Sequence, residues 1–166
     1  MKLHQKQDEV ASDIHRFRVL RCGRQFGKTT LAVEEIKGIA LSKPSIIYYF
    51  ATTHDQAREI AWEMLKKESA GMIKSVNNSL LELITRTQSE GESIIRLKGW
   101  ENVETMRGKQ ADMLILDEVA SMRNFWSNWN EVLTPTLSFR KGEGLFAYTP
   151  KGYNHFYDLC NLELTN

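Results

Sequence analysis

Residues 22–30 read Cys22-Gly-Arg-Gln-Phe-Gly27-Lys28-Thr29-Thr30, and this segment determines the class of fold. A β-prone run, 16–22, leads into it, and a segment with apolar residues at helical spacing, 29–41, follows it. A glycine-containing loop between a strand and a helix, closed by Lys and Thr, is typical of phosphate-binding loops, because main-chain N–H groups and a helix N-terminus attract anionic oxygens. One position departs from the usual spacing: Cys22 stands where glycine is expected.

Two carboxylates end a second buried strand further along the chain. The apolar run 113–116 is followed directly by Asp117 and Glu118. Ligands of open α/β sheets bind beyond the carboxyl ends of the strands, so we expect these acids to face the loop. Asp117 and the Thr29 hydroxyl would hold hydrated Mg²⁺, and Lys28 would contact the β- and γ-phosphates. Glu118 would orient the attacking water, which favours ATP hydrolysis over simple nucleotide binding.

The order of the remaining segments predicts the architecture. We expect strands at 46–51 and 144–148, a helix over 53–69 capped by Thr53, a hairpin from 80–85 and 93–97, a helix over 125–137 ended by Pro135, and a last helix over 153–162. Alternating strands and helices indicate an α/β fold. We therefore predict one P-loop NTPase domain over 1–166, of the ASCE type with a catalytic glutamate. Its sheet is mainly parallel, with helices on both faces and an antiparallel hairpin at one edge.

Composition narrows the class of protein without defining it. The formal net charge of +1 in 166 residues excludes a strongly basic nucleic-acid binder, so any DNA contact must be local or made by an assembly. No apolar run is long enough to span a bilayer, and the N-terminus lacks a signal peptide, so a cytoplasmic location is expected. Cys22 and Cys160 are far apart in sequence and are interpreted as reduced, structural thiols. The four tryptophans are expected in the core rather than as base-stacking platforms.

Several segments together resemble one family, the large terminase subunit, the DNA-packaging motor of tailed phages. The resemblance lies in its N-terminal ATPase domain and spans nearly the whole chain. The segments, in chain order, are Leu3-His4-Gln5-Lys6-Gln7, Gly23-Arg24-Gln25-Phe26-Gly27-Lys28-Thr29, Ala51-Thr-Thr-His-Asp-Gln56-Ala57-Arg58, Met106-Arg107-Gly108 and Tyr148-Thr149-Pro150-Lys151-Gly152.

The resemblance implies a set of nucleotide contacts. Gln7 stands at the family's adenine-reading position, and a carboxamide can both donate to and accept from the adenine edge; a surface Gln on an N-terminal helix is the alternative. The implied phosphate loop comprises Gly23, Arg24, Gln25, Phe26, Gly27, Lys28, Thr29 and Thr30.

Two arginines and a threonine take further roles by resemblance. Arg24 would contact phosphate within its own chain, or pair with a nearby acid. Arg107 would reach the γ-phosphate of a neighbouring subunit as an arginine finger, or form a structural pair with a carboxylate. Thr149 would sense the γ-phosphate and couple it to DNA movement; a turn initiated by Thr149-Pro150 is the alternative.

The resemblance also implies cofactors and partners. These are ATP and Mg²⁺, double-stranded DNA, the portal and procapsid, the small terminase subunit and a homo-oligomeric ring, in the host-cell cytoplasm and away from membranes. The chain is expected to be a fragment that lacks the family's lid and C-terminal nuclease domain, so no DNA cleavage is expected. Two alternatives remain: a helicase-type ATPase core, which Thr149-Pro150-Lys151 in place of Ser-Ala-Thr disfavours, and an ATP-switched binding module.

Overall fold

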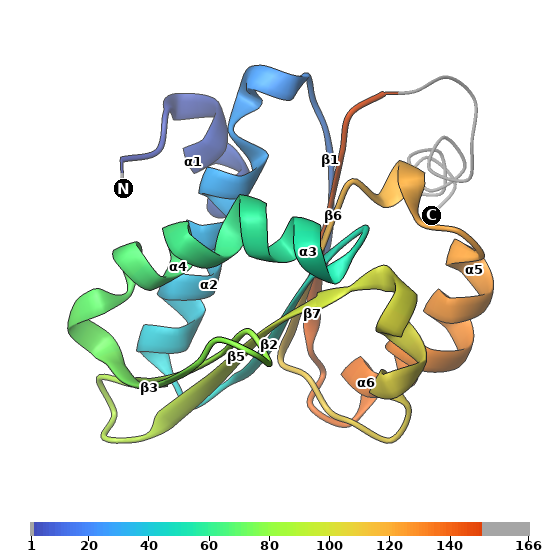
Figure 1. Ribbon diagram of the computed structural model, residues 1–166. Coiled ribbons are helices and arrows are strands. Elements are labelled where there is room, and N and C mark those ends of the chain that lie inside the picture. The colour runs from blue at the N-terminus through green and yellow to red at the C-terminus, as the bar shows by residue number, and fades with distance from the viewer. Residues whose placement is uncertain (1, 151–166) are drawn as a thin grey trace.

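In the computed structural model, which describes residues 2–150, seven strands form one sheet in the order β1-β7-β6-β2-β5-β4-β3 (Figure 1). The first five strands in this order run parallel, and β4 and β3 are antiparallel to their neighbours. The strands are β1 Phe17–Arg21, β2 Ile46–Ala51, β3 Ile73–Asn77, β4 Glu82–Arg86, β5 Glu92–Gly99, β6 Met113–Asp117 and β7 Glu143–Tyr148.

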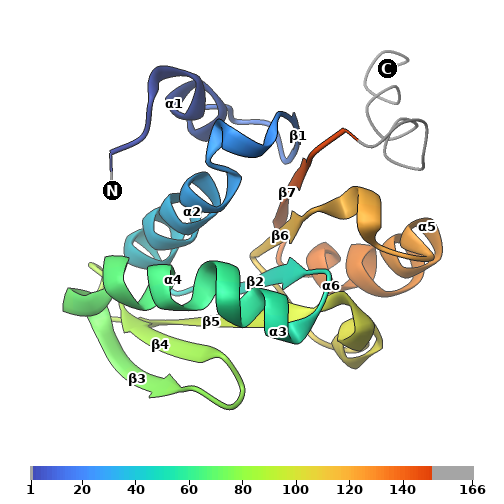
Figure 2. The ribbon, with the colours of Figure 1, turned by 45° about the horizontal axis from the view of Figure 1, so that its top comes forward.

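Helices cover both faces of this sheet, as predicted (Figure 2). The α-helices are α1 Gln5–Ala11, α2 Lys28–Ser42, α3 His54–Ala57, α4 Glu63–Glu68, α5 Phe125–Asn128 and α6 Thr134–Ser138. π-Helical turns at Arg58–Trp62 and Trp129–Leu133 join α3 to α4 and α5 to α6, and 3₁₀ segments span Arg24–Phe26, Ala70–Met72, Trp100–Met106 and Val119–Ser121. Helices α2 to α4 pack on one face, and α5, α6 and the 100–106 segment pack on the other.

The central strand β2 is apolar throughout because helices cover both faces of the sheet there. Alternate residues of β2 face opposite layers, so Tyr49 packs under α2 while Tyr48 and Phe50 pack against the α5–α6 side. A strand buried on both faces needs apolar side chains throughout, each stabilising the fold by about 1.5–3 kcal/mol. Trp62 and Trp100 are buried in these layers, which confirms the core interpretation for both.

An ion pair holds the helix that follows the phosphate loop against the strand that precedes it. Arg18 of β1 donates to both carboxylate oxygens of Glu35 in α2, at 2.7 and 2.9 Å, and both side chains are more than nine-tenths buried. Arg18 also donates to the carbonyl of Val10 in α1 at 3.0 Å. This contact fixes the relative placement of β1, α1 and α2, the elements that frame the loop.

The hairpin is confirmed, and the structure adds a strand to it. β4 and β5 pair antiparallel, but β5 also lies beside β2, so it belongs to the body of the sheet. The edge strand on this side of the sheet is β3, which the sequence analysis missed. Its sequence, Ile73-Lys-Ser-Val-Asn77, is mostly exposed and polar, so it has little hydrophobic periodicity to detect.

The expectation that Pro135 ends a helix is wrong. Helical structure continues through Pro135 to Ser138, because the preceding residues form a π-turn and Pro135 falls in the first turn of α6, where a missing N–H is tolerated. The carbonyl of Glu131, which residue 135 would serve in an α-helix, instead accepts a hydrogen bond from Arg107 at 3.2 Å. The helix predicted over 153–162 lies outside the described residues.

Candidate nucleotide-binding site

The loop between β1 and α2 has the backbone of an anion cradle. Gly27 adopts a left-handed conformation, with φ 79° and ψ 42°, and α2 begins at the next residue, Lys28. Helix α2 is fifteen residues long, so its N-terminal N–H groups and dipole are directed at whatever occupies the loop. Thr29 and Thr30 lie in its first turn, half-buried, while Arg24 and Gln25 are exposed to solvent.

Gln7 is bound to the loop itself. Its Nε2 donates to the carbonyls of Phe26 and Gly27, each at 3.0 Å, and its Oε1 accepts from the backbone N–H of His4 at 3.0 Å. The His4 side chain completes a capping box on α1. Only 3% of Gln7 is exposed, so it is no surface glutamine. Its amide and carbonyl are both engaged within the chain, and the adenine contact stays a prediction.

Lys28, Glu118 and Thr149 meet at the carboxyl ends of the parallel strands. The Lys28 Nζ lies 2.8 Å from the Thr149 Oγ1 and 3.2 Å from the Glu118 Oε1. The Thr149 hydroxyl donates to the Glu118 Oε1 at 2.8 Å, and its backbone N–H contacts the Oε2 at 3.4 Å. Three residues from the loop, the acidic strand end and the end of β7 thus form one hydrogen-bonded cluster.

Glu118 is held in this cluster by an unusual backbone. Its φ of 58° and ψ of 43° lie in the left-handed region, which costs a non-glycine residue roughly 1–2 kcal/mol. Strain of this kind persists where surrounding contacts determine the geometry, commonly at functional sites. Burial raises the pKa of Glu118, but the hydrogen bond from Thr149 and the charge of Lys28 outweigh it, so the net pKa is lowered. The carboxylate is therefore ionised at neutral pH.

Asp117 lies deeper, at the end of β6, and is 6% exposed. Its Oδ2 accepts a hydrogen bond from the Tyr49 hydroxyl at 2.8 Å, and its Oδ1 is buried with no partner among residues 2–150. A buried carboxylate oxygen without a donor is costly, and the water shell of Mg²⁺ would supply one. Burial raises the pKa of Asp117, and the bond from Tyr49 opposes the rise. The unpartnered oxygen of this carboxylate fits a hydrated Mg²⁺ ion.

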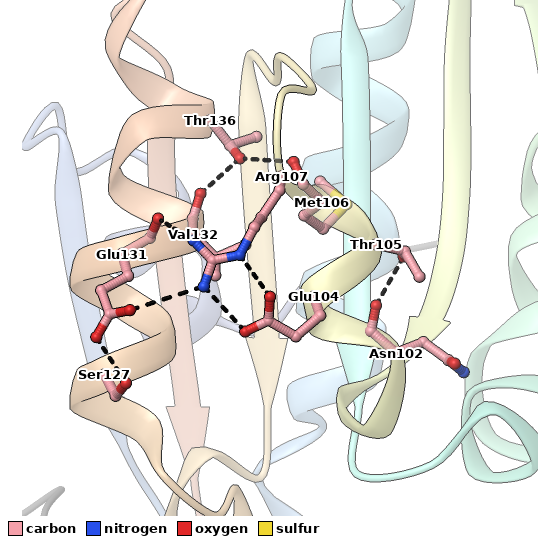
Figure 3. A network of polar contacts seen from close by, with 9 residues as sticks. All are labelled: Asn102, Glu104, Thr105, Met106, Arg107, Ser127, Glu131, Val132 and Thr136. Atoms are coloured by element: carbon pink, nitrogen blue, oxygen red, sulfur yellow. Dashed lines mark hydrogen bonds and ion pairs between the residues drawn. The ribbon is translucent and has the colours of Figure 1, made fainter.

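The Arg107 side chain makes a separate network (Figure 3). Its Nε and Nη2 donate to the Glu104 carboxylate at 2.5 and 3.1 Å, and Nη2 lies 3.7 Å from the Glu131 Oε2. The side chain is 51% exposed. Its hydrogen bonds and ion pairs go to Glu104 and Glu131 rather than to the Lys28 cluster, so the structure brings Arg107 together with carboxylates of its own chain.

Among residues 2–150 no group of three or more His, Cys, Asp or Glu side chains is placed to hold a metal ion. No helix in the same range is long and apolar enough to cross a membrane. Sequence reasoning missed Tyr49, which lies in the middle of an apolar run where no motif singles it out.

Loop, acidic strand end and sheet order define a P-loop NTPase-like fold. The family described as "Terminase large subunit, T4likevirus-type, N-terminal" matches residues 19–166. This chain belongs to that family. The terminase large subunit of Thermus virus P23-45 is 30% identical over 174 residues, a match covering 95% of this chain and 36% of that protein. The chain thus spans about a third of the length of the curated relatives it matches.

Solved structures agree with this assignment. The large terminase ATPase domain of Thermus phage P74-26 is 30% identical with a TM-score of 0.80, over 95% of this chain and 68% of that chain. The large terminase of a thermophilic bacteriophage, at 17% identity and a TM-score of 0.81, covers all of this chain and 44% of that chain, and supports the fold alone.

Proposed function

We propose that this chain hydrolyses ATP with Mg²⁺ and that the hydrolysis powers translocation of double-stranded viral DNA into a procapsid. The observation that carries the proposal is the convergence of Lys28, Glu118 and Thr149 at one sheet edge. The likeness to the ATPase domain of a Thermus phage large terminase supports it. Membership of the terminase family favours this function over a helicase core.

In the proposed site each residue has a role that its chemistry allows. The Lys28 ammonium binds the β- and γ-phosphates, and the main-chain amides of the loop and the first turn of α2 hold the same oxygens. Thr29 and Asp117 hold Mg²⁺ through its first or second shell, and the ion neutralises phosphate charge when bound. Glu118, ionised at neutral pH, orients and polarises the attacking water.

We propose that Gln7 supports nucleotide binding by holding the phosphate-binding loop. Its two bonds to the Phe26 and Gly27 carbonyls hold the loop in shape, and turning its carboxamide toward adenine would require giving up at least one of them. Arg24 is exposed beside the loop and is available to a phosphate.

Partners follow from the family as proposals for the whole protein. They are double-stranded DNA, the portal and procapsid, and the small terminase subunit, with the large subunits arranged as a ring in the host cytoplasm. In such a ring Arg107 is the candidate to reach a neighbour's γ-phosphate. Its present partners, Glu104 and Glu131, would have to release the guanidinium for that contact.

The test is a paired measurement on Glu118→Gln. Glutamine keeps the size of the side chain but cannot polarise water as a carboxylate does, so phosphate release should fall by at least about 100-fold. Binding of a fluorescent ATP analogue should persist. Glu92→Gln, an exposed residue of β5, is the matched control and should hydrolyse ATP like wild type.

Two outcomes would count against the proposal. Wild-type turnover in Glu118→Gln would remove the glutamate from the reaction. Tight nucleotide binding by the wild-type chain with no phosphate release under any condition, including added DNA and full-length subunits, would instead favour an ATP-switched binding module.

A further inference from the structure

Tyr49 lies directly behind Asp117 in the Mg²⁺ site proposed above, although no motif marks it. It is fully buried in β2, and it pairs in register with Ile115 of the neighbouring strand β6. Asp117 lies two residues beyond Ile115, on the same face of the sheet, since side chains alternate along a strand. The tyrosine ring therefore spans the distance along the sheet face, and its hydroxyl meets the Asp117 carboxylate at 2.8 Å.

The hydrogen bond distinguishes the two oxygens of Asp117. Oδ2 accepts from the phenol, and Oδ1 is buried with no partner in the described part of the chain. The terminal torsion of an aspartate is broad, so an unrestrained carboxylate samples many orientations. A donor fixed on one oxygen removes that freedom and leaves the other oxygen as the acceptor for a metal-bound water.

A phenol has one proton to donate, and Tyr49 donates it to the Asp117 Oδ2. The hydroxyl is therefore committed to the one carboxylate that is assigned to the ion.

We propose that Tyr49 is a positioning residue for Mg²⁺: its buried hydroxyl, carried on β2, holds the Asp117 carboxylate at the end of β6 in the orientation that presents Oδ1 to the ion's water shell. The inference rests on the proposed function, because it concerns the same site. Partners of this kind behind metal-binding groups typically contribute a factor of about 10–100 in metal affinity.

Tyr49→Phe removes the hydroxyl and keeps the ring, and the adjacent residue supplies a matched control. Tyr48 lies on the opposite face of β2, and its hydroxyl accepts from Arg96 at 3.1 Å, away from the site. Tyr48→Phe therefore makes the same chemical change in the same strand. For each variant we would measure Mn²⁺ binding to the protein–ADP complex by electron paramagnetic resonance, and ADP binding in EDTA by fluorescence competition.

We expect Tyr49→Phe to weaken Mn²⁺ binding at least about tenfold while ADP binding in EDTA is unchanged, and Tyr48→Phe to alter neither. Unchanged Mn²⁺ binding in folded Tyr49→Phe would overturn the inference. If Tyr49→Phe weakens ADP binding in EDTA as much as it weakens Mn²⁺ binding, the inference is also overturned, because the hydroxyl then has a purely structural role. If wild type itself binds no Mn²⁺ with ADP, the proposed function fails instead.

A second pair of variants keeps the test decisive if Tyr49→Phe does not fold. 4-Fluorophenylalanine at position 49 fills the space of the hydroxyl without donating, and 4-aminophenylalanine restores a donor. The inference predicts weak Mn²⁺ binding in the first and recovery in the second. Equal Mn²⁺ binding by the two would contradict it.

Discussion

Replacing Gly27 by alanine tests how the loop is held in shape. Gly27 has φ +79°, and a Cβ added there would lie 2.7 Å from the Gln7 Nε2, closer than such contacts occur. The amide of Gln7 would therefore have to move, although it makes the two hydrogen bonds to the carbonyls of Phe26 and Gly27. The substitution therefore perturbs both the backbone at Gly27 and the two hydrogen bonds by which Gln7 holds the loop.

The expected loss of stability combines a backbone cost, the hydrogen bonds to Gln7 that are lost, and an opposing effect on the unfolded chain. The left-handed backbone costs an alanine roughly 1–2 kcal/mol, and each lost hydrogen bond to Gln7 about 1 kcal/mol. Alanine also restricts the unfolded chain, which offsets about 0.4–1 kcal/mol. We expect Gly27→Ala to lower the free energy of unfolding by about 2–3.5 kcal/mol.

Gly23 provides the matched control within the same loop. Its φ of −67° suits any residue, and an added Cβ would meet nothing within 4 Å. Gly23→Ala should therefore be neutral or slightly stabilising. Urea unfolding without nucleotide gives the free energy of unfolding of both variants. Repeating Gly27→Ala in a Gln7→Ala background separates the backbone cost from the loss of the Gln7 hydrogen bonds. If Gly27→Ala proves as stable as Gly23→Ala, the reasoning about the loop is refuted.

Three further predictions concern other contacts of the site and its frame. Glu35→Gln leaves Arg18 buried without its counter-ion and should cost about 3–5 kcal/mol in urea unfolding, with a smaller loss when Arg18→Met accompanies Glu35→Leu. Because folding lowers the pKa of Glu118 from its ordinary value of 4.5, the ionised carboxylate stabilises the fold fully at pH values above 4.5. This stabilisation is lost as the pH falls through the lowered pKa, so the stability difference between wild type and Glu118→Gln should shrink on acidification. Arg107→Ala subunits should regain ATP hydrolysis when mixed with subunits that carry Arg107 and Glu118→Gln, and no recovery in such rings would exclude a role between subunits.

The convergence of the site was predictable from sequence because it follows from topology. Lys28 begins a helix after one parallel strand, and Glu118 and Thr149 follow two others. The carboxyl ends of parallel strands share one edge, so the order of these segments already implies their proximity. The alternation of strands and helices predicted helices on both faces of the sheet, and two strand-like runs around a polar connection predicted the hairpin.

What could not be predicted depends on contacts between residues distant in sequence. Nothing local indicates that Gln7 faces loop carbonyls or that Tyr49, one of two adjacent tyrosines, faces Asp117. That choice depends on the register of β2 against β6, and a shift of one residue would exchange the tyrosines between faces. Pro135 was misjudged for a similar reason, since an arginine almost thirty residues earlier serves the carbonyl that the proline cannot.

The hydrogen bond between Lys28 and Thr149 indicates how nucleotide binding would change the contacts of Thr149. An ammonium has three protons, and in this structure Thr149 and Glu118 both lie within reach of it. Phosphate oxygens that attract the ammonium compete with both partners at once, so Glu118 loses a counter-ion and Thr149 a donor in the same event. Glu118 and Thr149 are hydrogen-bonded to each other in this structure, so a shift of the glutamate would stretch this bond or move Thr149 with it. If Glu118 has the role proposed for it, the coupling expected of Thr149 needs no separate sensor, because the Thr149 hydroxyl is already hydrogen-bonded to that glutamate.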